Sequence, residues 1–252
     1  MKSNLTPERE MARRTRRGFL GLGAGALVAA GGWQWLKAGY ERGGDIPAPL
    51  RTVLGFNEKV ARNLLFSNDH LVKTFPASAI GKLKQNDVND LSADFDEDDW
   101  TLQVMPRDGG LPKTLNIDDI RALPKHDEII DFKCVEGWSV VTQFAGARFS
   151  DFTAKFATGS EKAGYVGMAT PDGGYYVGLD MPSALHPQTL LAYEMNGQKL
   201  GDLEDDHGAP LRLVIPVKYG IKNIKRIGKI AYGETEPPDY WKQRGYDFYA
   251  GL

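Results

Sequence analysis

The stretch Phe132-Lys133-Cys134-Val135-Glu136-Gly137-Trp138-Ser139 decides how this chain is interpreted, because it holds the only cysteine among 252 residues. Ile129 and Ile130 precede it in the pattern of a buried strand, and Gly137 allows the backbone to turn sharply after it. We therefore expect Cys134 where a strand ends. A thiolate there could bind a transition metal or act as a nucleophile, and the simplest alternative is a small buried apolar side chain.

The composition is that of a globular protein with a substantial core. Hydrophobic residues make up 42% of the chain and charged residues 25%, which predicts one large domain or two small ones. The formal net charge is −2, and the basic side chains are concentrated at the start: residues 1–17 hold six basic and two acidic side chains. Because the remainder is acidic, we expect no nucleic-acid partner.

The N-terminus has the pattern of a twin-arginine export signal. Thr15-Arg16-Arg17-Gly18-Phe19-Leu20 leads into an apolar run, rich in Gly and Ala, that ends near Leu36. An ordinary basic leader is the alternative. The twin-arginine route carries folded proteins, commonly with a cofactor inserted, so the pattern favours a cofactor-binding protein of the periplasm. Cleavage near Val28-Ala29-Ala30 and an uncleaved membrane anchor over residues 18–36 are both left open.

The chain is predicted to divide into two parts. Residues 1–45 form the signal, which could remain as an anchor, together with a linker, and residues 46–252 form one domain. The linker is indicated by the glycines and prolines between residues 40 and 50. A single cysteine excludes an internal disulfide framework, so Cys134 is inert, intermolecular or functional.

Local patterns in the domain predict both helices and antiparallel strands. Helical spacing predicts a helix over residues 56–66 with Asn57 as its cap, a second over 114–123, and a third capped by Ser150 or Asp151. Pro171-Asp172-Gly173-Gly174 and Asn196-Gly197 are hairpin signals. Strands are expected at residues 100–104, 165–170, 175–179, 190–194, 211–215 and 224–231. This pattern favours an α+β fold with mixed, largely antiparallel sheets.

Two later motifs complete the pattern that begins at Cys134. They are His207-Gly208-Ala209-Pro210-Leu211-Arg212 and Lys218-Tyr219-Gly220-Ile221-Lys222-Asn223-Ile224-Lys225. Together with the cysteine stretch they resemble the molybdopterin-binding domain of the sulfite oxidase family, in particular its bacterial branch similar to the periplasmic methionine sulfoxide reductase catalytic subunit. The similarity runs over roughly residues 56–252 and is strongest after residue 129.

The resemblance implies a role for each matching residue. Cys134 would be the single protein thiolate on molybdenum, because a soft metal suits a thiolate and keeps it deprotonated. His207 and Arg212 would contact the cofactor. Asn223 and Lys225 would bind the phosphate of the pterin.

Two further cofactor contacts are implied by position in the family pattern. Thr170 lies close to a position that touches the pterin, within one residue of the alignment. Asn57 matches a more distant motif whose aromatic neighbours are replaced in this chain.

The implied function is oxygen-atom transfer on a sulfoxide or sulfite-type substrate by a Mo-molybdopterin oxidoreductase. The substrate would be a small molecule or a methionine-sulfoxide-type side chain. Electrons would pass to or from a separate partner, a cytochrome or a membrane haem protein, because the chain has no Cys-x-x-Cys-His site. We expect a monomer that also engages the twin-arginine export machinery.

Two alternatives come from other functional classes. The protein could bind molybdopterin without turnover, as a cofactor carrier or a docking module for a partner. It could also be a metal-free thiol enzyme that uses Cys134 and His207.

Overall fold

The structure is a computed structural model that describes residues 48–85 and 95–251. It contains two units, residues 1–54 and residues 55–252, and only the start of a helix is described in the first. The predicted export signal and the predicted boundary at residue 45 lie outside the described residues and stay predictions. Within the described residues, no helix is long and apolar enough to cross a membrane.

The first described element is a helix that begins earlier than predicted. Helix α2 covers Ala48–Val60, and the π-helical segment η1, Ala61–Leu65, continues it. Pro49 indicated a linker in the sequence, but proline is well tolerated in the first turn of a helix. Asn57 lies inside α2, three residues before its end, so its predicted capping role is wrong.

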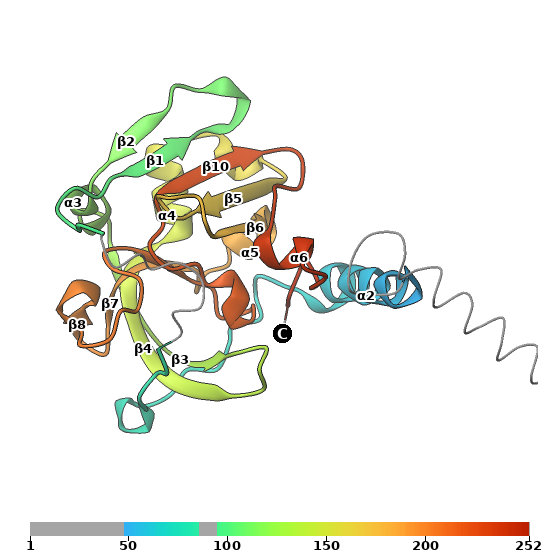
Figure 1. The fold of residues 1–252 in the computed structure, drawn as a ribbon, viewed down its shortest axis with the longest axis horizontal. Helices are drawn as coiled ribbons and strands as arrows, with labels where there is room; N and C mark the ends of the chain where they lie inside the picture. The colour runs from blue at the N-terminus through green and yellow to red at the C-terminus, as the bar shows by residue number, and fades with distance from the viewer. Residues whose placement is uncertain (1–47, 86–94, 252) are drawn as a thin grey trace, which may run out of the picture. The chain divides into compact units, whose positions relative to one another are not determined.

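One sheet holds five strands of the described chain in the order β2-β1-β10-β5-β6 (Figure 1). Strand β1 pairs in parallel with β10, and the other neighbours pair antiparallel. The strands are β1 (Leu102–Met105), β2 (Lys113–Leu115), β5 (Tyr165–Ala169), β6 (Tyr176–Asp180) and β10 (Lys229–Gly233).

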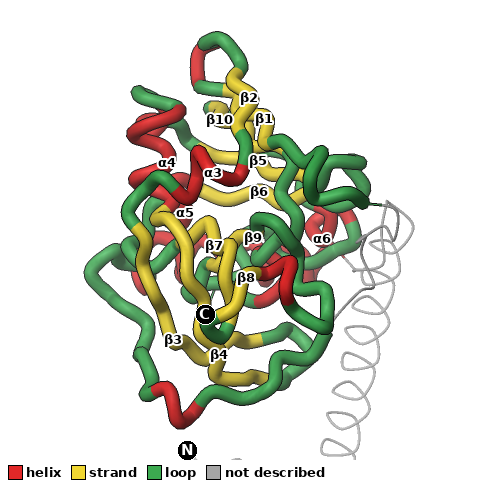
Figure 2. The backbone as a smooth tube through the Cα atoms, turned by 90° about the vertical axis from the view of Figure 1, so that its left-hand side faces the viewer, coloured by secondary structure: helices red, strands yellow, loops and turns green. Residues whose placement is uncertain are grey.

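The second sheet is antiparallel throughout its described pairs. Its order is β3-β4-β7-β8, and β9 also pairs with β7 (Figure 2). The strands are β3 (Lys125–Lys133), β4 (Ser139–Arg148), β7 (Leu190–Met195), β8 (Gln198–Lys199) and β9 (Arg212–Val214). The predicted α+β class with mixed, largely antiparallel sheets is confirmed.

Short helices connect the strands. The α-helices are α3 (Ile117–Arg121), α4 (Phe149–Phe156), α5 (Met181–Ala184) and α6 (Tyr240–Gln243). Single 3-10 turns are η2 (Ala77–Ala79), η3 (Arg107–Gly109), η4 (Ser160–Lys162), η5 (Leu200–Asp202) and η6 (Gly220–Lys222).

Several predicted boundaries need correction. The helix predicted over 114–123 is split, because residues 113–115 pair with β1 and Asn116 then caps α3 with a capping box. Helix α4 begins at Phe149, so Ser150 and Asp151 lie within its first turn and do not cap it. The strand predicted over 224–231 begins only at Lys229. Both predicted hairpins are confirmed by the pairs β5–β6 and β7–β8.

Strand β7 separates two hydrophobic clusters. Leu191 and Tyr193 point into the larger cluster, which packs against the first sheet and helix α4. Leu190 and Ala192 point into the smaller cluster, with residues of β3 and β4. Successive side chains of a strand face opposite sides. Leu190 to Tyr193 are all buried because both faces of β7 are covered. The smaller cluster supports the site described next.

Candidate functional site

The turn between β3 and β4 places the single cysteine in the wall of a pocket. Cys134 directly follows β3, and its backbone N–H donates to the carbonyl of Trp138 at 3.0 Å. Gly137 has a φ of +88°, which glycine adopts more readily than other residues, and its N–H donates to the Cys134 carbonyl at 3.2 Å. The prediction that Cys134 lies where a strand ends is confirmed.

The environment of the Cys134 thiol disfavours its ionised form. Burial raises the pKa of Cys134, and the charge of Glu136 raises it further against two backbone hydrogen bonds that lower it. Reactive thiolates have lowered pKa values, so the structure gives no support to the thiol-enzyme alternative. A bound metal would displace the proton, because a coordinating thiol is deprotonated outright.

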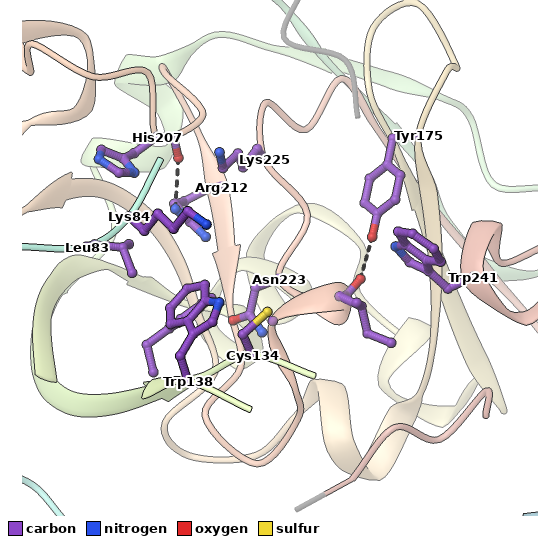
Figure 3. Close-up of a pocket in the computed structure, with 13 residues that line it drawn as sticks. Leu83, Lys84, Cys134, Trp138, Tyr175, His207, Arg212, Asn223, Lys225 and Trp241 are labelled. Carbon is purple, nitrogen blue, oxygen red and sulfur yellow. Dashed lines mark hydrogen bonds between the residues drawn. The ribbon is translucent and has the colours of Figure 1, made fainter. Parts of the chain in front are cut away.

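The pocket gathers five of the seven predicted site residues: Cys134, His207, Arg212, Asn223 and Lys225 (Figure 3). They come from three separate segments of the chain. The complete lining is Leu83, Lys84, Phe132, Cys134, Trp138, Tyr175, His207, Arg212, Gly220, Ile221, Asn223, Lys225 and Trp241.

Arg212 is a buried cation at the start of β9. Only 2% of the residue is exposed, and its guanidinium lies 5.8 Å and 5.1 Å from the ring centroids of Phe132 and Phe144. Its Nη1 donates to the His207 carbonyl at 2.9 Å, whereas its Nε has no hydrogen-bond partner. Burial lowers the pKa of Arg212 to about 10, so the side chain still carries its charge at neutral pH.

His207 is a neutral imidazole beside this cation. The residue is 4% exposed, and its Nδ1 has no hydrogen-bond partner. Burial, followed by the charges of Arg212 and Lys225, lowers the pKa of His207 to about 4. The structure therefore offers two buried polar atoms, on two neighbouring side chains, that a ligand in the pocket could satisfy.

A close backbone approach brings His207 and Lys225 to the same pocket. Gly208 has a φ of +99°, and a Cβ at this position would lie 2.8 Å from the Cα of Lys225. The N–H of Arg226 donates to the Gly208 carbonyl at 3.2 Å. Glycine is required here because both the space and the backbone angle exclude a larger residue.

Asn223 shapes the pocket through internal hydrogen bonds. Its Oδ1 accepts from the N–H of Ile215 at 2.8 Å, and its Nδ2 donates to the Tyr219 carbonyl at 3.1 Å. Its side chain thus holds the segment after η6 against the residues that follow β9. A contact between Asn223 and the cofactor phosphate stays a prediction.

The far wall of the pocket was missed in the sequence. Tyr175 and Trp241 face Cys134 across the pocket (Figure 3). The Tyr175 hydroxyl donates to the Ile221 carbonyl at 2.6 Å, and burial raises the pKa of Tyr175 above its usual range, so the phenol stays protonated. The sequence shows both aromatic residues, but no local pattern predicts that Tyr175 or Trp241 lies near Cys134.

Thr170 and Asn57 do not line this pocket. The hydroxyl of Thr170 closes the β5–β6 turn, because it accepts from the N–H of Tyr175 at 3.1 Å and donates to Asp172 at 2.5 Å. Asn57 is exposed on α2. Thr170 lines a separate pocket with Trp100 and Asp172. The predicted cofactor contacts of Thr170 and Asn57 therefore stay predictions.

The pocket does not resemble a metal site built from protein ligands alone. Among the described residues, no group of three or more His, Cys, Asp or Glu side chains could hold a metal ion. A metal bound at Cys134 would therefore need most of its ligands from a cofactor.

Sequence comparison identifies the family of the chain. The family described as the oxidoreductase molybdopterin-binding domain matches residues 89–241, more than half of the chain. The chain belongs to this family. The predicted molybdopterin-dependent oxidoreductase, and the resemblance on which it rested, are confirmed at this level.

Three relatives carry related names. The protein-methionine-sulfoxide reductase catalytic subunit MsrP of Campylobacter jejuni is 30% identical over 98% of this chain and 83% of its own length. The putative protein-methionine-sulfoxide reductase subunit YedZ1 of Azospira oryzae is 36% identical over 54% of this chain and 50% of its own. MsrP of Ralstonia nicotianae is 32% identical over 56% of this chain and 47% of its own length.

One solved structure shows a weaker likeness. The sulfane dehydrogenase SoxCD from Paracoccus pantotrophus has a TM-score of 0.49 and 16% identity, over 57% of this chain and 40% of that chain.

The residues of the pocket fit a molybdopterin. Arg212 and Lys225 would supply positive charge for a pterin phosphate, and the unpartnered Nε of Arg212 and Nδ1 of His207 could form hydrogen bonds to the ligand. Cys134 supplies the single soft donor that a molybdenum ion would need from the protein.

Proposed function

We propose that this protein is an exported Mo-molybdopterin oxidoreductase that reduces a sulfoxide to a thioether. The reaction breaks the S–O bond and consumes two electrons and two protons, and its products are the thioether and water. The observation that carries the proposal is the pocket in which Cys134, His207, Arg212 and Lys225 meet. The names of three relatives, which are methionine sulfoxide reductase subunits, favour a sulfoxide over sulfite.

The bound cofactor supplies the two-electron redox chemistry, and the protein supplies the environment. Cys134 holds the metal from the end of β3, where the tight turn fixes its backbone. Arg212 provides a permanent positive charge, since its pKa of about 10 keeps it protonated at neutral pH. That charge stabilises the anionic parts of the cofactor and the oxygen that leaves the sulfur.

The remaining walls orient the ligand and exclude water. His207 is neutral at physiological pH and can donate one hydrogen bond and accept another. Trp138 lies on the cysteine side, and its indole N–H is held by Glu136 at 2.8 Å. Tyr175 and Trp241 form an apolar wall on the far side, where a thioether could make sulfur–aromatic contacts.

We further propose that the protein acts in the periplasm and takes its electrons from a separate membrane haem protein or cytochrome. The twin-arginine pattern at Arg16 and Arg17 supports export of a folded, cofactor-loaded protein. The chain contains no Cys-x-x-Cys-His site for a covalently bound haem of its own.

Molybdenum content and sulfoxide reduction test the proposal together. Purified holo-protein should contain molybdenum and oxidise a reduced viologen dye when methionine sulfoxide is added. Cys134→Ala should lose at least about a hundredfold in turnover, because second-shell changes alone cost up to that much and this change removes a ligand. Full molybdenum loading without turnover on sulfoxides, N-oxides or sulfite would favour the binding-module alternative.

A further inference from the structure

An unusual surface lies at the start of the described chain, where large apolar side chains face solvent. Within the described residues, eight large hydrophobic side chains are exposed, and five of them fall between residues 53 and 71. They are Val53 at 55%, Phe56 at 65%, Leu64 at 77%, Leu65 at 66% and Leu71 at 62% exposed. We call the side of the helix that carries Phe56 and Leu64 the outer apolar face.

Two charged side chains of the same helical segment, Glu58 and Arg62, point the other way. Arg62 donates from Nη2 to the Tyr165 hydroxyl at 3.0 Å, and its guanidinium lies 5.4 Å from the centre of that ring. Glu58 is half-buried and lies 4.0 Å from Arg62. Burial raises the pKa of Glu58, and its contact with Asp247 raises it further. The polar face of the helix is therefore the one that contacts the domain.

Helical geometry accounts for this inverted pattern. At about 100° per residue, Phe56 and Leu64 lie on one side of the helix, and Glu58 and Arg62 lie on the opposite side. A helix on the surface of a soluble domain normally buries its apolar stripe and exposes its charges. Large apolar side chains exposed together on one side of a helix indicate a surface that contacts something else.

The sequence upstream indicates what covers this face. Residues 18–36 form the apolar run that suits a bilayer, and only residues 37–47 join it to α2. Eleven residues span at most about 40 Å when fully extended, so a run inserted in a bilayer would keep α2 near the lipid surface. Lys59, which is exposed on the same helix, suits anionic headgroups.

We propose that the outer apolar face docks on the surface of a lipid bilayer. The helix would lie in the interface, with Phe56 and Leu64 among the acyl chains and its inner face fixed to the domain by Arg62. The proposal assumes that residues 18–36 remain on the protein, and it is independent of the reaction catalysed in the pocket. Its consequence is a fixed orientation of the domain at the membrane.

Amide hydrogen exchange of the cofactor-loaded full chain tests the proposal. Exchange is measured in buffer and after addition of vesicles of phosphatidylethanolamine and phosphatidylglycerol. Peptides covering residues 56–71 should exchange at least about tenfold more slowly on vesicles, because burying these side chains in lipid stabilises the helix against local opening. In the double variant Phe56→Asn/Leu64→Asn, vesicles should slow exchange of the same peptides by less than about twofold. Residues 18–36 are unchanged in this variant, so it should still bind the vesicles.

Matched controls separate docking from damage to the fold. Leu111→Asn makes a similar change at a residue that is 86% exposed elsewhere, and it should behave as the wild type. Peptides from β3 and β4 should exchange alike in every protein. Equal exchange of residues 56–71 with and without vesicles would overturn the proposal. Slower exchange that appears only at high protein concentration would overturn it in favour of a second copy of the chain. Slower exchange that appears only when a membrane protein is present would overturn it in favour of a protein partner.

Discussion

At the scale of single residues, the buried charge of Arg212 tests the proposed cofactor site. Within the described residues it forms no salt bridge, and its Nη1 donates to the His207 carbonyl. Replacing an unpaired buried charge by an apolar side chain is often neutral or stabilising. Arg212→Met should therefore leave the free energy of unfolding of the cofactor-free protein unchanged or higher, while molybdopterin content falls roughly tenfold.

A paired arginine provides the matched control for this prediction. Arg226 lies 2.5 Å from Asp206 and stacks on Phe95, with its guanidinium 4.1 Å from the ring centre. Arg226→Met should lower the free energy of unfolding by roughly 1–3 kcal/mol in urea titrations. If Arg212→Met were the destabilised variant and kept its full molybdopterin content, Arg212 would be a structural residue and its assignment to the cofactor would be wrong.

His207 makes the stability of the cofactor-free protein depend on pH. Its pKa is about 4 in the folded protein, below the ordinary value of 6.5, so between these values the unfolded state binds more protons. The His207 contribution is therefore intact above pH 6.5 and is lost as the pH falls to 4, by about 3 kcal/mol in total. Urea titrations of the wild type and His207→Asn should diverge in this window. Parallel pH profiles would contradict the buried neutral imidazole.

At the scale of elements, the crossing of the 207–212 segment over Lys225 is the most sensitive point of the site. A Cβ on Gly208 would lie 2.6 Å from the Cβ of Lys225, at a positive φ. Gly208→Ala should lower the free energy of unfolding by at least about 2 kcal/mol and reduce cofactor content. Gly233→Ala in β10 meets nothing within 4 Å and should change stability by less than about 1 kcal/mol. Equal effects of the two changes would refute this account of the crossing.

Elements specified by local chemistry were predicted well. Gly173-Gly174 and Asn196-Gly197 impose tight turns, and both hairpins form where these residues predicted them. Elements decided by tertiary pairing were not. Thr114 and Leu115 suit a helix by sequence spacing, yet they pair with β1, and the helix starts only after the Asn116 cap. Helix α2 was predicted too short because Pro49 was interpreted as part of a linker.

At the scale of the whole molecule, only the part of the site that belongs to sequence motifs could be predicted. Cys134, His207, Arg212 and Lys225 belong to motifs of fixed order, and the structure brings them into one pocket. The far wall arises from tertiary contacts alone, since Tyr175 and Trp241 lie 66 residues apart in the sequence. Nothing local in the sequence links Trp241 to Cys134, and no local pattern revealed that Glu58 and Arg62 face the domain.

Export is a property of the whole chain and is tested in cells. Changing Arg16 and Arg17 together to lysine removes the paired guanidinium groups that define the signal, although it keeps the charge. We expect the protein to remain in the cytoplasm, folded and loaded with molybdopterin, when the cell fractions are compared by immunoblotting. Lys2→Arg alters the same basic region without touching the motif and should leave export intact. Periplasmic accumulation of the Arg16→Lys/Arg17→Lys protein would refute the twin-arginine assignment.

The central claim is that Cys134 is a ligand of molybdenum, and X-ray absorption at the molybdenum edge tests it most directly. The measurement counts the sulfur neighbours of the metal in the loaded wild type and in loaded Cys134→Ser. The account predicts one sulfur neighbour fewer in the variant, since this cysteine is the only one in the chain. An identical sulfur count in the two proteins would contradict it.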